Sequence, residues 1–382
     1  MKKLRAVLPF LILLSGPGWS LDQKFLEPIT PVSSALRGQG SVWAANTEGW
    51  DALFANPAAF ATDKTSLTVL QVGALGFVSP SGLNKILANR DTLMNLNVAD
   101  STNPNSQMLN SFLTTTGLGA EATVGGGWVG NNWGGGLLIQ DQTYGQGLTL
   151  LGSTFKTRQS IVGVIGYAWP FEVPLGKLKF GFDARPEQVS YSTPTVSDLV
   201  KNLTGSTISS GFGLGLDMGA RWEYDRFKTG LVIRDLGSTV INFNDYSFSQ
   251  WTASAGMPLT GNSASSTVYR IPMVVALGTS YSPDMGALTP TMKTTLSADL
   301  QVPLMDQYTQ PSFWAWTHLG VEAHFLDFLS VRTGLNQGYF TFGLGTKVMA
   351  VDFNLAISTD ELGRYSGATP RPALSVDLGV HL

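Results

Sequence analysis

The last stretch of the chain, PALSVDLGVHL from Pro372 to Leu382, alternates apolar and polar residues without a break. Alternation with a period of two predicts a β-strand that has one apolar face and one polar face. In an outer-membrane barrel the apolar face points to lipid and the polar face to the lumen. Because a barrel leaves no open edge in lipid, we expect this last strand to pair with the first strand of the wall.

The composition fits one large barrel or two soluble domains and excludes several other classes. The 382 residues include no cysteine, 43 glycines, 10 tryptophans and only 13% charged residues. Beyond the amino terminus, no segment approaches the roughly 20 apolar residues of a membrane helix, which argues against a helical membrane protein. The formal charge of −3 leaves no basic surface, so we expect no nucleic-acid partner.

Residues 1–20 have the layout of a cleaved secretory signal peptide. Basic residues as far as Arg5 precede an apolar run from Ala6 to Leu14, and the small residues Gly18 and Ser20 precede the expected cut. A buried amino-terminal helix is the alternative, but the prolines and glycines of this stretch break it. We therefore expect export to the outer membrane of a diderm bacterium.

Residues 21–63 do not alternate and are predicted to form a plug inside the barrel of residues 64–382. Trp50, Leu53 and Phe54 have the spacing of a short apolar helical face, and Asn56-Pro57 ends it. The alternative is a disordered leader, but the segment is too rich in apolar residues to stay solvated.

From residue 66 onward the chain reads as an all-β transmembrane antiparallel barrel of about fourteen strands. Phe212 to Tyr224 is the clearest strand, because its apolar residues alternate with glycines and with Asp217, Arg221 and Glu223. Short and long connections alternate along the chain, as expected for turns on one side of a membrane and loops on the other. The long connections are predicted at 78–116, 145–159, 187–209, 237–268, 303–315 and 359–371. The first contains apolar residues at helical spacing, which predict short amphipathic helices over the barrel mouth.

Positive and negative side chains assigned to the lumen nearly balance, whereas an ion-selective pore would favour one sign. We predict a hydrogen-bonded network that grips the plug, with Arg37 as a partner on the plug. The wall residues of this network are expected to be Asp183, Arg185, Asp217, Arg221, Arg234, Asp299, Glu322 and Arg332.

The signal peptide, the amino-terminal segment ending in Asn56-Pro57-Ala58 and the fourteen or so strands resemble the FadL/TodX family of outer-membrane transport proteins for hydrophobic compounds. The stretches 329–335 and 338–345 resemble its smaller FadL-like and PorV-like branch. In that family the Asn-Pro-Ala turn belongs to the hatch, and substrates leave sideways through the wall beside a kinked strand. Gly125–Gly127 and Gly134–Gly136 are candidates for such a bend, although wall glycines also make room for aromatic rings.

The resemblance implies passive uptake of hydrophobic small molecules such as long-chain fatty acids, and insertion by the barrel-assembly machinery. Residues expected to serve the hatch and its ligand are Asn56, Pro57, Ala58, Arg37, Trp50 and Phe54. A PorV-like protein that binds or shuttles exported proteins, and a general diffusion porin, remain alternatives. A bound secreted protein would favour the PorV-like alternative, and steady ion conductance would favour the porin.

No catalytic pairing is visible in the sequence, so we expect no enzyme, and neither a cofactor nor a metal. His318, Glu322 and His324 share a strand face, but the two histidines are separated by about 20 Å at the rise of a β-strand, too far for one metal ion.

Overall fold

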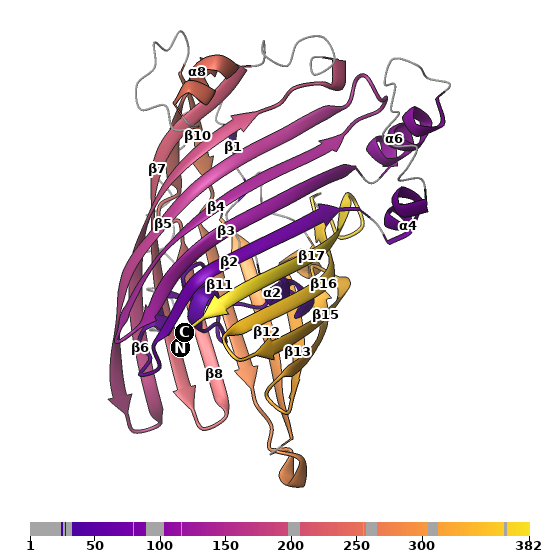
Figure 1. The fold of residues 1–382 in the computed structure, drawn as a ribbon. Helices are drawn as coiled ribbons and strands as arrows, with labels where there is room; N and C mark the ends of the chain where they lie inside the picture. Colours follow the sequence, from indigo (N-terminus) through magenta and orange to yellow (C-terminus); the bar gives the residue numbers. More distant parts are fainter. Residues whose placement is uncertain are drawn as a thin grey trace.

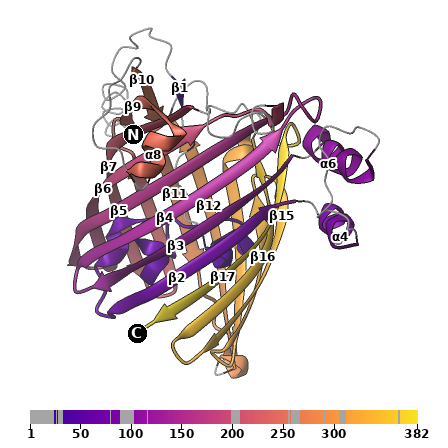
Figure 2. The same cartoon turned by 45° about the horizontal axis from the view of Figure 1, so that its top comes forward.

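In the computed structural model, a closed antiparallel barrel of 14 strands surrounds a short helical segment (Figures 1 and 2). The structure describes residues 24–25, 27, 33–78, 80–88, 103–115, 117–197, 207–254, 256, 266–289, 291–304, 312–362 and 365–382. The predicted signal peptide and most of residues 21–32 lie outside these ranges. Among the helices described, none is long and apolar enough to cross a bilayer.

The wall closes as the last strand predicts. Strand β17 (Pro370–His381) pairs with β2 (Ser66–Phe77), with Val376 opposite Ala74 and Leu378 opposite Val72. The other continuous strands are β3 (Leu118–Gly130), β4 (Trp133–Gln146), β5 (Thr154–Val173), β6 (Gly176–Ser192), β7 (Thr207–Tyr224), β12 (Met292–Pro303), β13 (Thr317–Phe325), β14 (Leu329–Asn336), β15 (Tyr339–Val348) and β16 (Val351–Glu361).

Two wall strands are interrupted side by side. β8 (Phe227–Arg234) and β9 (Thr239–Ser247) both pair with β7, so they form one wall strand with a break at 235–238. β10 (Ser266–Ile271) and β11 (Val274–Tyr281) pair with β9 and β8 and form the next. The predicted loop 237–268 is therefore wrong in its first part, because the chain turns at the break and then rejoins the same wall. The two-residue β1 (Lys24–Phe25) runs parallel to β10.

Side chains alternate between the faces as predicted. On β7, Phe212 and Leu214 are 63% and 55% exposed on the outside, whereas Asp217 and Arg221 are buried inside. Aromatic rings cluster on the outside near the short turns. The ring centroid of Tyr167 lies 4.9 Å from that of Trp133 and 4.8 Å from that of Trp169. Such a surface suits lipid flanked by an aromatic girdle.

The long connections carry helices α4 (Pro80–Ala88), α6 (Pro104–Thr115) and α8 (Phe248–Ala253), and 3-10 turns η4 (Gly286–Leu288) and η5 (Phe313–Trp316) lie between strands. In both views α4 and α6 stand beside the rim rather than across the mouth (Figures 1 and 2). The predicted position of the first-loop helices is therefore wrong, because α6 packs at the end of β4, where Leu113 accepts a hydrogen bond from Gly147.

Candidate functional site

Within the predicted plug, residues 33–63 fold as three short helical turns inside the wall. These are α2 (Ser34–Gly38), α3 (Gly49–Ala52) and η2 (Pro57–Phe60). The side chains of Trp50, Leu53 and Phe60 pack against inward-facing Val129, Leu138, Val162, Val164 and Ala168 of the wall. Burial of these apolar side chains stabilises the seated plug, since each is worth about 1.5–3 kcal/mol.

Glycines of the inner wall give the plug its seat. A Cβ at Gly125 would clash with the Trp50 ring, and one at Gly134 or Gly166 would clash with Phe60. Strands β3 and β4 stay in continuous register along these glycines, whereas the pairing of β2 with β3 shifts register between Thr68 and Gln71, opposite Gly125–Gly127. The glycine triplets therefore make room for aromatic rings, and Gly125–Gly127 also lie beside an irregularity in the first wall strand.

Asn56 is the residue before η2, Pro57 and Ala58 are the first two residues of η2, and all three are buried. The Asn56 side chain accepts a hydrogen bond from the Ala58 N–H at 3.0 Å and donates one to the Ala44 carbonyl at 2.6 Å. It therefore caps η2 and joins two parts of the plug. Asn56 also lies against wall residue Gly219, where no side chain would fit.

Wall side chains bind the plug backbone at several points. The Asp299 carboxylate accepts hydrogen bonds from the N–H groups of Trp43 and Ala44, at 2.6 and 2.8 Å. Arg221 donates to the Thr47 carbonyl at 3.0 Å. Hydrogen bonds to a charged group contribute about 1.5–3 kcal/mol each, so these contacts hold the middle of the plug in place.

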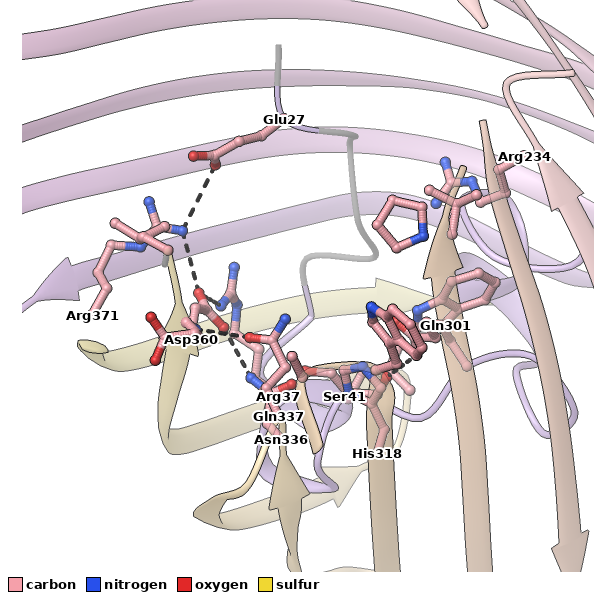
Figure 3. A pocket seen from close by; sticks show the side chains of 18 of the residues that line it. Glu27, Arg37, Ser41, Arg234, Gln301, His318, Asn336, Gln337, Asp360 and Arg371 are labelled. Carbon is pink, nitrogen blue, oxygen red and sulfur yellow. Dashed lines mark hydrogen bonds and ion pairs between the residues drawn. The ribbon is translucent and has the colours of Figure 1, made fainter. Parts of the chain in front are cut away.

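Arg37 of the plug forms an ion pair with Asp360 of β16 at 3.3 Å, and Asp360 also pairs with Arg371 of β17 at 3.4 Å. Figure 3 shows the three side chains converging on one side of the cavity above the plug. The sequence predicted Arg37 as a partner but missed Asp360, because residues 359–371 read as a loop.

The other predicted network residues do not all reach the plug. Arg185 pairs with Asp217 and Asp235 at the wall break, Asp183 is buried nearby, and Arg234 lies 3.5 Å from Asp217. Arg234 also lies 5.7 Å from the ring of Trp43 on the plug. Glu322 and Arg332 pair with each other on adjacent strands. The predicted single network is therefore split, and much of it stabilises the wall.

His324 contacts Ser330 and Glu322, which the sequence did not predict. His324 lies 2.8 Å from the Ser330 hydroxyl through Nδ1 and 3.2 Å from Glu322 through Nε2. His324 and Ser330 are directly opposite across paired strands, and Glu322 is held by Arg332, so the contact is a wall interaction. In the described ranges no three His, Cys, Asp or Glu side chains converge as metal ligands.

Two connected cavities lie above the plug and together form what we call the vestibule. The inner cavity, about 280 Å³, rests on Leu36, Arg37 and Trp43. The outer cavity, about 550 Å³, is lined by tyrosines and basic side chains. They share Glu27, Gln142, Arg158, Leu362 and Arg371.

Below the plug is a third cavity, the lower chamber, of about 490 Å³. It is lined by the plug residues Ser33, Trp50 and Asp51 and by wall residues near the short turns, and it shares no lining residue with the inner cavity. The plug therefore lies between the vestibule and the lower chamber.

Comparison with known proteins gives a fold but no close relative. No family model matches the chain, and no curated protein matches it. Among solved structures, the CymD monoaromatic hydrocarbon channel aligns at 10% identity over 93% of this chain and 98% of that one, with a TM-score of 0.51. The chain has the FadL/TodX-type barrel fold.

Two further solved structures align at lower TM-scores. The Pseudomonas putida toluene transporter TodX is 12% identical over 94% of this chain and 98% of its own, with a TM-score of 0.47. A Pseudomonas aeruginosa FadL homologue is 12% identical over 94% and 99%, with a TM-score of 0.48. At these identities the likeness concerns the fold, so the function of this chain must be argued from its own residues.

Proposed function

We propose that this protein is an outer-membrane channel for passive uptake of hydrophobic small molecules, and that long-chain fatty acids are among its cargo. The outer surface supports the location, because large apolar side chains cover the wall and aromatic pairs gather near the short turns. The CymD channel, which shares the fold, is described as a channel for monoaromatic hydrocarbons.

The observation that carries the finer proposal is the chemistry of the vestibule. Its outer cavity combines Tyr144, Tyr191 and Leu148 with the basic side chains of Lys156 and Arg371. Apolar side chains suit a hydrocarbon chain, and a guanidinium suits a carboxylate, which it can bind through two hydrogen bonds. A fatty acid offers both groups, whereas an aromatic hydrocarbon offers only the first.

The Arg371 guanidinium is held in position and, within the described part of the chain, has a free hydrogen-bond donor for such a carboxylate. Its guanidinium lies 4.3 Å from the ring of Phe77 and 5.5 Å from that of Tyr144, which fixes its position by cation–π contact. Its Nε, like Nη2 of Arg158, is buried without a hydrogen-bond acceptor in the described structure. A buried donor without a partner costs about 1–3 kcal/mol, so an anionic head group would recover that free energy.

The same arginine connects the vestibule to the plug. Asp360 pairs with both Arg371 and Arg37, and all three side chains line the inner cavity. A carboxylate that reaches both arginines would compete with Asp360 for Arg37 and so weaken this tie between plug and wall. The cargo is then released when the plug rearranges around Asn56, Pro57 and Ala58. The barrel-assembly machinery is the expected partner during insertion, as for outer-membrane barrels in general.

The test compares a long-chain fatty acid with the alcohol of the same chain length, by displacement of a fluorescent fatty acid from purified protein in detergent. We expect the acid to bind more tightly, and Arg371→Gln to weaken it tenfold or more while leaving the alcohol unchanged. Glu172→Gln, at the exposed short turn between β5 and β6 and away from the vestibule, is the matched control.

Equal binding of acid and alcohol would refute the fatty-acid proposal and leave a channel for neutral hydrocarbons, with toluene as the probe. If neither class binds and the reconstituted protein conducts ions steadily, the porin alternative holds. Capture of a defined exported protein without any binding of small molecules would favour the PorV-like alternative.

A further inference from the structure

Two acidic side chains of the plug line the lower chamber, Glu48 and Asp51 of α3, and Glu48 forms an ion pair with Lys228 of the wall. Asp51 is half-buried and lines the lower chamber. Its carboxylate accepts a hydrogen bond from the Ser33 hydroxyl at 3.1 Å. No ion pair to Asp51 is found within the described ranges, although the plug is otherwise held by charged partners. The carboxylate therefore lacks the compensation that a buried charge normally needs.

A second carboxylate, from the wall, meets the same end of the plug. Asp377 of β17 accepts a hydrogen bond from the N–H of Ser34, the residue after the one that binds Asp51. Asn354 of β16 donates a second hydrogen bond to Asp377 at 2.9 Å. Residues 33 and 34 thus place a plug carboxylate and a wall carboxylate close together across the plug–wall boundary.

The charged surroundings do not neutralise Asp51. Burial raises its pKa to about 7, and the negative charges of Asp377 and Glu322 add to the rise, while Ser33 and Arg332 oppose it. Other charged or titratable groups that line the chamber are Glu48, Lys64, Arg221, His324, Asp327, Lys347, Asp352 and His381. Three of these groups already have a charged partner. Glu48 pairs with Lys228, Asp327 with Lys293, and His324 with Glu322.

We propose that Asp51 is a proton-operated latch, which holds the plug against the wall when its carboxyl is protonated and loosens it when the carboxylate faces Asp377. The protonated acid keeps its contact with Ser33 and brings no like charge to the boundary. Loss of the proton leaves two carboxylates side by side in a partly desolvated place, and moving the plug into the chamber water relieves both costs.

The direction of the pH effect follows from linkage. The seated plug holds the Asp51 proton more tightly than the unseated plug, so seating is favoured at low pH and is weakened as pH rises toward about 7, beyond which no further change is expected. The channel should therefore be more tightly closed in acid. The proposal rests on the proposed function only in taking the plug as the seal of the lumen.

The test measures exposure of the plug without any cargo. Because the chain has no cysteine, Ala55→Cys places a single thiol at a position that is only 3% exposed in the plug. Its maleimide labelling rate in detergent is divided by the rate for the unfolded protein at the same pH. With pKa values of about 7 seated and 3.8 unseated, opening should rise about thirtyfold from about pH 5.5 to about pH 8.5.

Asp51→Asn in the Ala55→Cys background should label slowly at every pH, within about twofold across the range. Asp377→Asn keeps an acceptor for Ser34 but removes the neighbouring charge, so it should flatten the pH dependence only in part. A pH dependence of Asp51→Asn equal to that of the parent would overturn the latch. If that variant does not fold, an unchanged pH dependence in Asp377→Asn overturns it. Fatty-acid binding can fail without affecting any of these readouts.

Discussion

The seat of the plug depends on small residues in the wall, and Gly230→Ala tests this most directly. Gly230 of β8 faces the plug backbone at Ala44. A Cβ at this position would lie 2.7 Å from the carbonyl carbon of Ala44 and closer still to its oxygen, whereas ordinary contact begins at 3.4 Å. Plug and wall must therefore separate by at least 0.7 Å, the difference between 3.4 and 2.7 Å.

That displacement reaches the bonds to Asp299. If the plug retreats by the same amount from Asp299, the N–H to carboxylate distances of 2.6 and 2.8 Å become 3.3 and 3.5 Å, beyond the usual range for a hydrogen bond. Loss of two hydrogen bonds to a charged acceptor costs about 3 kcal/mol, and overpacking adds about 1 kcal/mol. A total of about 4 kcal/mol shifts the equilibrium between seated and unseated plug by about a thousandfold.

Single-channel conductance in a planar bilayer measures this shift. We expect long open events in Gly230→Ala where the parent protein stays closed, with the heat stability of the barrel unchanged. Gly135→Ala is the matched control, because Gly135 lies on the wall where an added Cβ meets only the Val164 carbonyl, at 3.8 Å. Equal open probability in the two variants would refute the idea that wall glycines seat the plug.

Two further variants probe the plug from other sides. Arg37→Ala leaves Asp360 with Arg371 as its remaining partner, so we expect a loosened plug, with a free-energy cost of about 3 kcal/mol; unchanged conductance and protease resistance would contradict this. Asn56→Ala removes the cap of η2 and the bond to Ala44, which costs about 2 kcal/mol and should increase protease cleavage within the plug, while Asn84→Ala at an exposed position of α4 should not.

Much of the barrel could be predicted from the sequence because alternation reports the two faces of a wall directly. The pairing of the last strand with the first and the burial of Asp217 and Arg221 both follow from it. Strand length was harder to predict. β5 runs for 20 residues, twice what a bilayer needs, since its inner and outer faces continue to alternate above the membrane.

The break at 235–238 shows why a local signal can mislead. Asp235, Gly237 and Ser238 all have positive φ angles, as their residue types suggest for a turn. The sequence therefore predicts correctly that the strand stops here. It does not show that the strand resumes in the same wall, because this depends on pairing of β9 with β7 and β10, far apart in the chain.

The sequence predicted that charged wall residues bind the plug, but it identified only some of those residues. Charges on the polar faces indicate a lumen network, yet which charge meets the plug depends on where the plug lies along the barrel axis. Asp299 lies level with the plug backbone, whereas Arg185 and Asp217 meet the wall break instead. The alternation within one strand does not show how far along the barrel axis a residue lies. The sequence therefore could not separate the charged residues that contact the plug from those at the wall break.

Helix α2 brings the upper and lower contacts of the plug together. Arg37 near its end reaches Asp360 beside the vestibule, and Ser33 and Ser34 at its start meet Asp51 and Asp377 beside the lower chamber. Because these positions are one helical turn apart, about 5 Å, a shift of α2 that breaks one contact strains the other. Cargo binding above and proton loss below should therefore favour the same unseated plug, and each should increase the effect of the other.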